Sequence, residues 1–260
     1  MTRLADTHCH LYMKGLSHRL DEVFRNASGA GVERYMLVSS DEQSSFEVVS
    51  MLGRFSEKGV YGAVGVHPHD SKSVAEGLPE ELTDLAGNER VLAVGETGLD
   101  YYYDHSPRDI QKKVFSMHIG FAREAGKPLI IHARDSYNDV LSLLEKEKAH
   151  ECGGVIHCFS GTTADAARAL KLGFYISFAG PVTYPRNGGL RKAAAVIPED
   201  RILCETDSPF LAPQPVRGAT NEPAMVRHVY EAVAAARGVP LEELAPKIWR
   251  NASDLFGWPD

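Results

Sequence analysis

The sequence contains few cysteines and no cysteine pair with the CxxC spacing of zinc ribbons or thiol oxidoreductases. Four of the 260 residues are cysteines, namely Cys9, Cys152, Cys158 and Cys204. Three of them lie in or beside short apolar runs, which is typical of buried, reduced thiols. A disulfide scaffold is therefore excluded, and all four thiols are predicted to be free.

Long hydrophobic runs are also missing. No stretch approaches the roughly 18 consecutive apolar residues that a membrane-spanning helix needs. The first residues, Met1 to Asp6, include an acid where a secretory signal peptide needs an apolar segment. The sequence therefore predicts a cytoplasmic protein with no membrane partner, and no feature predicts an obligate protein partner.

An excess of positive charge is the third absence. The chain carries 28 Lys and Arg residues against 35 Asp and Glu residues, for a formal net charge of −7. A surface that is basic all round is excluded, so any contact with nucleic acid needs a local cationic patch. Because linkers, low-complexity tracts and repeats of fixed period are missing as well, we expect residues 1–260 to form a single domain.

What the sequence does contain is an alternation of short apolar runs with longer amphipathic ones. Eight apolar runs predict β-strands at residues 4–8, 35–39, 60–66, 91–95, 128–132, 154–158, 174–178 and 201–205. The segments between them include 108–125, whose apolar residues recur every three or four positions as in a helix. Eight strands alternating with helices favour an α/β fold, a (β/α)8 TIM barrel, over a doubly wound sheet.

Side chains of metal-ligand type gather at the predicted strand ends, where the catalytic groups of such barrels lie. These groups are His8, His10, Glu96, His132, His157 and Asp207. Residues two apart on a strand point to the same face, so His8 and His10 can both reach into the barrel mouth. The set predicts a site for two divalent ions, and its mixture of imidazoles and carboxylates leaves the identity of the metal open.

The remaining histidines are not predicted to be metal ligands. His67 and His69 flank Pro68 after the third predicted strand. We interpret His67 as a substrate-contacting or supporting group rather than a ligand, and His69 as structural or solvent-facing. The others fall in predicted helices or loops without convergent partners, and no site role is assigned to them: His18, His105, His118, His150 and His228.

The ordered motifs resemble those of the TatD-type metal-dependent deoxyribonucleases, a family within the amidohydrolase-like TIM barrels. They cover nearly the whole chain, as DTHCH at 6–10, GVHPH at 65–69, GETGLDY at 95–101, HAR at 132–134, HCFSG at 157–161 and ETDSPFLAP at 205–213. The sequence departs from the family pattern in two places. Thr220 stands where the family usually has a basic residue, and His118 stands at a commonly polar amide position.

The resemblance implies a binuclear metal centre. A first ion is held by His8, His10, Glu96 and Asp207, and Glu96 bridges to a second ion that is held by His132 and His157. The ions are Zn, Mn or Mg. The implied activity is hydrolysis of DNA phosphodiester bonds by a metal-activated water, in an exonucleolytic manner on single-stranded or end-bound DNA. Glu96 and Asp207 are the expected catalytic carboxylates, with Asp207 as ligand and general base.

Four side chains are candidates for contact with the substrate, namely His67, Arg134, Phe159 and Arg217. We interpret Arg134 either as a phosphate clamp or as a salt-bridge partner of Asp135, and Arg217 as a weaker clamp. Phe159 and the tyrosines at 101–103 are candidates for stacking on a terminal base, although we expect at least one of these tyrosines to pack within its loop.

Two other functions remain open at this stage. The same binuclear barrel serves hydrolases of other esters, amides or phosphoesters, because the fold does not determine the substrate. No Lys ends the fourth or fifth strand to supply a carboxylated bridging ligand, which favours the nuclease branch. A catalytically inactive metal-binding module is the second alternative, and it would be expected to have a broken ligand set or an extended basic face.

Overall fold

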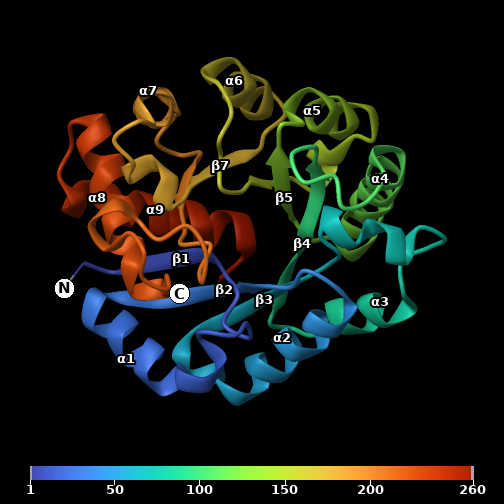
Figure 1. Cartoon of the computed structure of the whole chain (residues 1–260), viewed down its shortest axis with the longest axis horizontal. Coiled ribbons are helices and arrows are strands. Elements are labelled where there is room, and N and C mark those ends of the chain that lie inside the picture. The colour runs from blue at the N-terminus through green and yellow to red at the C-terminus, as the bar shows by residue number, and fades with distance from the viewer. Residues whose placement is uncertain (1, 259–260) are drawn as a thin grey trace.

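The computed structural model describes residues 2–258 as a nearly closed barrel of eight parallel strands (Figure 1). The strands are β1 (Leu4–Cys9), β2 (Val32–Val38), β3 (Val60–Val64), β4 (Val91–Asp100), β5 (Leu129–Arg134), β6 (Gly154–Ile156), β7 (Tyr175–Phe178) and β8 (Ile202–Cys204). Each strand pairs in parallel with the next along the chain, in the order β1 to β8. The predicted TIM barrel is therefore confirmed.

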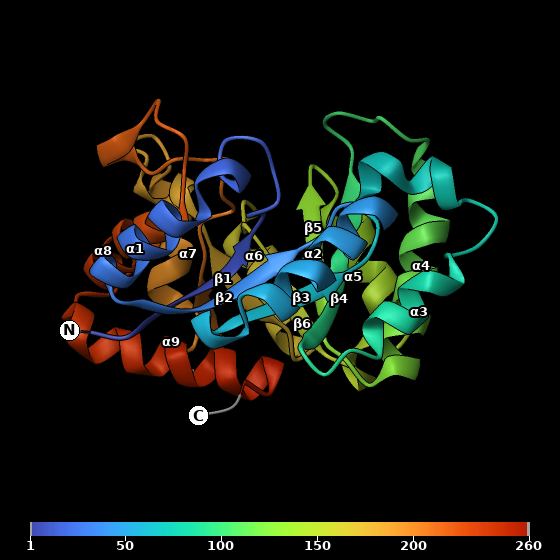
Figure 2. The same cartoon turned by 90° about the horizontal axis from the view of Figure 1, so that it is seen from below.

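Nine helices accompany the strands in the described part of the chain. They are α1 (Leu20–Ala30), α2 (Glu42–Arg54), α3 (Glu80–Ala86), α4 (Arg108–Ala125), α5 (Tyr137–Lys146), α6 (Thr163–Lys171), α7 (Gly188–Val196), α8 (Val226–Arg237) and α9 (Leu241–Phe256). Figure 1 shows α1 to α8 around the outside of the strands, and Figure 2 shows α9 along the lower edge, beneath β1 and β2.

Each helix buries the apolar face that its sequence pattern predicts. In α4, for example, Val114, Phe115, Ile119 and Ala122 are buried against the sheet at three- and four-residue spacing. The core therefore lies between the strands and the surrounding helices, as well as inside the barrel. Across residues 2–258, no helix combines the length and the apolar character that crossing a membrane requires.

The sheet closes where the chain leaves β8 and returns to β1. Thr206, just beyond β8, donates its backbone N–H over 2.8 Å and its hydroxyl over 2.6 Å to the carboxylate of Asp6 in β1. The backbone N–H of Asp207 donates to the carbonyl oxygen of His8 over 2.9 Å. These bonds bring the two ends of the barrel sequence together at the C-terminal edge of the sheet, where the predicted ligands lie.

Strand β4 is longer than the predicted segment 91–95, because it continues through Asp100. Within this extension, Gly98 permits a close approach to β5. A β-carbon at Gly98 would lie 2.0 Å from the carbonyl oxygen of His132, and the backbone angle φ of Gly98 is +140°. Glu96 and Asp100 therefore both lie within the strand rather than in a loop.

Asn251 in α9 offers a test of how this helix is held to the barrel. Its side-chain amide donates to the carbonyl oxygens of Glu199 and Ile202 over 2.8 and 2.9 Å, and the residue is buried. We expect Asn251→Ala to lower the free energy of unfolding by about 2–3 kcal/mol, because the buried carbonyl group of Ile202 and the partly buried one of Glu199 lose their donor. Urea unfolding measures the change.

The matched control is Asn138→Ala, at an exposed position of α5. It should change the free energy of unfolding by less than about 0.5 kcal/mol. Equal unfolding midpoints for Asn251→Ala and the unmodified protein would contradict the anchoring role of Asn251.

Candidate metal centre

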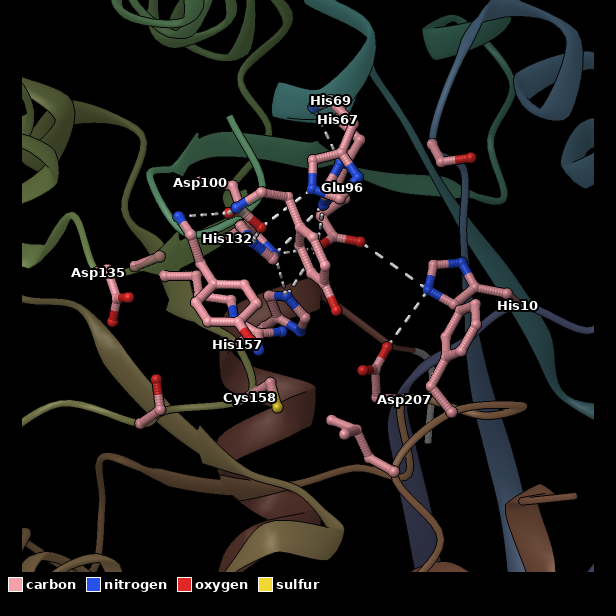
Figure 3. A pocket seen from close by; sticks show the side chains of 18 of the residues that line it. His10, His67, His69, Glu96, Asp100, His132, Asp135, His157, Cys158 and Asp207 are labelled. Atoms are coloured by element: carbon pink, nitrogen blue, oxygen red, sulfur yellow. Dashed lines mark hydrogen bonds and ion pairs between the residues drawn. The ribbon is translucent and has the colours of Figure 1, made fainter. Parts of the chain in front are cut away.

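The carboxylate of Glu96 lies at the centre of a histidine cluster at the C-terminal end of the barrel (Figure 3). Its Oε1 atom is 2.7 Å from Nε2 of His157 and 2.9 Å from Nδ1 of His132. Its Oε2 atom is 3.3 Å from Nε2 of His8 and 3.9 Å from Nε2 of His10. The two carboxylate oxygens therefore face two different pairs of histidines.

Asp207 joins the first of these pairs. Its Oδ1 atom is 3.4 Å from Nε2 of His10 and 3.8 Å from Nε2 of His8, and these two nitrogens are 3.1 Å apart. Asp207 has a φ of +58°, in the left-handed region that Asp tolerates better than most residues. Together with its backbone bond to His8, this conformation directs the carboxylate toward the pair.

Three of the four candidate ligand histidines are oriented by acceptors behind them, whereas Nδ1 of His8 has no hydrogen-bond partner among residues 2–258. The three pairs are Nδ1 of His10 with the carbonyl oxygen of Val38 (2.7 Å), Nε2 of His132 with Oδ2 of Asp100 (3.0 Å) and Nδ1 of His157 with Oε1 of Glu205 (3.2 Å). When each outer nitrogen donates its proton to such an acceptor, the other nitrogen presents a lone pair to the cavity. Outer acceptors orient metal-binding histidines in this way, so the residues fit a divalent cation.

The charges of the cluster lead to the same conclusion. Burial raises the pKa of Glu96, but the charges of His157, His67 and His8 outweigh burial and hold this pKa well below its usual range. Burial lowers the pKa of His8. Burial also lowers the pKa of His157, but Glu96 and Glu205 outweigh it and raise this pKa well above its ordinary value. A buried, ionised carboxylate of this kind needs positive charge close by. A protonated imidazole such as that of His157 can supply this charge, and bound cations would supply it when they replace the proton.

His67 also reaches the cluster. Its Nε2 atom is 3.3 Å from Nδ1 of His132 and 3.5 Å from Oε1 of Glu96, so its position alone would allow it to be a ligand. However, its Nδ1 atom accepts the backbone N–H of His69. The neutral ring therefore carries its proton on Nε2 and presents a donor to the cavity, which is consistent with a supporting or substrate-contacting role.

Asp100 is the main site residue that the sequence patterns did not identify. Its Oδ2 atom accepts from His132 and from Nε2 of His69, each over 3.0 Å. Its Oδ1 atom accepts the backbone N–H groups of Tyr102 and Tyr103, over 3.0 and 2.9 Å. The signal that could have found it is its spacing of four from Glu96, which places both on one face of a strand.

Two of the histidines without an assigned role pack near the site. His118 is buried in α4, where its Nδ1 donates to the carbonyl oxygen of Val114 and its Nε2 accepts the backbone N–H of Val66. Burial lowers the pKa of His118 to about 4, so this ring is a neutral packing residue. His105 lies beside His69, with ring centroids 4.6 Å apart.

The cluster lies in a cavity of about 810 Å³, and two of the four substrate-contact candidates, His67 and Arg134, line it. Phe159 does not line the cavity, because this residue is 2% exposed and its ring packs against Tyr137 and Phe178. This burial leaves no ring face for a base. Arg217 is exposed and lies over the ring of Tyr184, outside the cavity lining.

Arg134 forms no salt bridge within residues 2–258, including with the adjacent Asp135. Its guanidinium carbon instead lies 4.2 Å from the ring centroid of Tyr102 and 4.9 Å from that of Tyr103. Tyr101 contacts the neighbouring helices rather than the cavity, since Arg108 of α4 lies over its ring and its hydroxyl donates to Asp139 of α5 over 2.7 Å. Arg134 is therefore available to an anionic ligand.

Comparison with known proteins places this arrangement in a family. A family model described as TatD related DNase matches residues 5–257. The chain belongs to the TatD family. It is similar to the metal-dependent hydrolase YcfH of Escherichia coli, with 42% identity over 256 residues that cover 97% of this chain and 95% of YcfH. It is also similar to the metal-dependent hydrolase YabD of Bacillus subtilis, with 40% identity over 97% of this chain and 98% of YabD.

Other TatD relatives extend the comparison. The 3'-5' ssDNA/RNA exonuclease TatD of Klebsiella pneumoniae is 34% identical over 91% of each chain. The crystal structure of YJJV, a TatD homologue from Escherichia coli, superposes with a TM-score of 0.90 at 26% identity over 99% of each chain. A mutant organophosphorus hydrolase shares the fold, with a TM-score of 0.69 at 17% identity. The superposition covers 98% of this chain and 92% of the hydrolase. The protein is thus a metal-dependent hydrolase of the TatD family.

The role of Asp100 can be tested by Asp100→Asn. The substitution keeps an oxygen for the backbone N–H groups of Tyr102 and Tyr103 but removes the charge behind His132. We expect the affinity for divalent metal to fall about 10–100-fold. Titration of the metal-free protein with Zn²⁺ or Mn²⁺ in competition with a chelating dye measures this change.

The control is Asp135→Asn, which makes the same substitution in the same cavity. Asp135 has a backbone φ of +53°, which asparagine also tolerates. Its metal affinity should equal that of the unmodified protein. If Asp100→Asn binds metal as tightly as Asp135→Asn does, Asp100 does not support the ligand His132.

Proposed function

We propose that the protein is a nuclease that uses two divalent cations to hydrolyse phosphodiester bonds in DNA, removing nucleotides from single-stranded ends. The observation that carries the proposal is the Glu96 carboxylate, whose two oxygens face separate histidine pairs. The family description and the printed activity of the Klebsiella relative support nucleic acid as the substrate.

The residues that would hold the cations follow from the two carboxylate oxygens of Glu96, each of which faces a different histidine pair. One ion would be held by His8, His10 and Asp207 with Oε2, and the other by His132 and His157 with Oε1. Histidine-rich sets favour Zn²⁺ over Mg²⁺. When bound, such ions supply positive charge to the phosphoryl oxygens and lower the pKa of water.

Asp207 is the carboxylate best placed to take the proton from the attacking water. Both side chains line the cavity, but that of Asp207 is 12% exposed, whereas that of Glu96 is 5% exposed and is surrounded by five histidines. Burial raises the pKa of Asp207, but its hydrogen bond with His10 and the charges of His8 and His157 together outweigh burial and keep the pKa below its usual value. The carboxylate is therefore ionised at neutral pH and can accept a proton.

Arg134 is proposed to contact a phosphate of the strand. The guanidinium has no competing carboxylate partner among residues 2–258, and its contacts with Tyr102 and Tyr103 fix its direction. A guanidinium offers paired donors that match phosphate oxygens. The neutral Nε2–H of His67 is a second donor for the same group.

The activity is tested with metal-loaded protein on end-labelled single- and double-stranded DNA, with lactones, cyclic amides and phosphotriesters as alternative substrates. We expect stepwise shortening of single-stranded DNA. Turnover of another ester or amide without cleavage of DNA would contradict the proposal. Turnover of none of them would favour the inactive metal-binding module.

The base role of Asp207 predicts that Asp207→Asn lowers kcat on single-stranded DNA by about 10²-fold or more. Metal content must be measured in the same preparation, since Asp207 is also a proposed ligand. Asp135→Asn again serves as the matched control and should retain full activity. Full turnover by Asp207→Asn would exclude Asp207 as the base.

The clamp role of Arg134 predicts that Arg134→Ala raises KM for single-stranded DNA about ten-fold or more, because a charge-assisted hydrogen bond is lost. The value of kcat should change much less. Arg217→Ala, which removes an arginine outside the cavity, should leave KM unchanged. Equal KM values for the two variants would contradict the clamp.

A further inference from the structure

Exposed aromatic rings gather at the cavity that holds the histidine cluster. Five large hydrophobic side chains are strongly exposed in the described part of the chain, and three of them line this cavity. These three are Tyr102 (59% exposed), Tyr103 (49%) and Phe210 (51%), whereas Phe46 and Val196 lie elsewhere. Exposed apolar surface that collects at one cavity indicates a ligand with apolar faces.

The two tyrosines differ in how much of each ring is already used. Tyr103 stacks on His105 with nearly parallel rings, 5.5 Å apart at 9°, and also lies beneath Arg134. Tyr102 stands perpendicular to Tyr103, with ring centroids 4.8 Å apart, and is the more exposed of the two. Tyr102 also lies against Arg134, whose guanidinium carbon is 4.2 Å from its ring centroid, so the opposite face of Tyr102 is the one that can receive a base. Tyr103 supports this ring from its edge.

Tyr102 and Phe210 are held on opposite sides of Glu96. The backbone of Tyr102 is bonded to Asp100, which also accepts from His132. The backbone N–H of Phe210 donates to the carbonyl oxygen of Asp207 over 2.9 Å, and its ring centroid lies 6.1 Å from that of His10. Figure 3 places His132 and His10 on either side of Glu96.

The charge of the cavity wall favours contacts with the bases of a nucleic acid over contacts with its sugar-phosphate backbone. The lining includes five carboxylates and one guanidinium, namely Asp70, Glu96, Asp100, Asp135, Asp207 and Arg134. A polyanion gains little from such a wall outside the metal centre and Arg134. Aromatic faces, in contrast, bind any unpaired base without needing positive charge. The volume of about 810 Å³ suits a ligand the size of a few nucleotides rather than a duplex.

We propose that Tyr102 and Phe210 stack on the two nucleobases that flank the scissile phosphate of a single strand. This inference rests on the proposed nuclease function, because it places the phosphate at the cluster between the two rings. Bases in a duplex are already paired and stacked, so they cannot use these faces without melting. The two rings thus account for a preference for single strands that is independent of base sequence.

The test uses single-stranded oligonucleotides in which one nucleotide, either the terminal or the penultimate one, is replaced by an abasic analogue, with separate sets for the 3' and 5' ends. The metal-loaded protein should cleave the intact strand about ten-fold more efficiently, in kcat/KM for the first cleavage, than either abasic strand. Tyr102→Ala should lose the preference for a base at one of the two positions, and Phe210→Ala at the other. Tyr102→Phe should keep both preferences.

Binding of phosphorothioate oligonucleotides, followed by fluorescence anisotropy, gives a readout independent of turnover and should show the same pattern. The control Phe46→Ala removes an exposed aromatic ring away from the cavity and should keep both preferences. Metal content should be equal in all variants, which excludes an effect through Asp100 or Asp207.

The possible failures are distinguishable. If the unmodified protein cleaves intact and abasic strands equally, or if both alanine variants keep both preferences or lose the same one, the stacking inference is wrong while the nuclease function stands. If the metal-loaded protein cleaves no intact strand, the nuclease function itself is refuted, and the stacking site with it.

Discussion

The joining of β1 to the segment after β8 is the constraint on which the rest of the site depends. His8 and Asp207, two of the proposed ligands, lie far apart along the chain, and they come into contact only because the segment after β8 meets β1. Ions that bind both residues would bind the closed sheet and not the unfolded chain. Metal binding should therefore contribute directly to the stability of the barrel.

The fold and most of the ligand cluster could be predicted from the sequence, because they depend on periodicity and on strand ends. Alternating apolar runs define the strands, and a parallel barrel places their C-terminal ends together whatever the details of packing. His132 and His157 could be placed in this way without knowledge of any contact. The extension of β4 could not be predicted in this way. Glycines are common in turns, and only the contact with the neighbouring strand shows why Gly98 fits within a strand here.

Residues outside the regular elements were harder to place. A motif locates Phe159 next to His157, but the direction of its ring depends on Tyr137 and Phe178, which come from other parts of the chain. The choice between clamp and salt bridge for Arg134 likewise depends on Tyr102 and Tyr103, because the guanidinium lies over their rings. Side-chain direction in loops is a tertiary property and leaves no periodic signal in the sequence.

Asp100 has a further consequence because it serves two groups at once. One of its oxygens orients His132, and the other fixes the turn that carries Tyr102. A ligand that holds the Asp100 carboxylate in place through His132 therefore also holds it in place for Tyr102, and the reverse is also true. In the proposed nuclease, occupancy of the metal centre and affinity for a strand would then be thermodynamically linked, and each would strengthen the other by the same factor. A protein without its metal would accordingly bind substrate more weakly, as well as fail to cleave it.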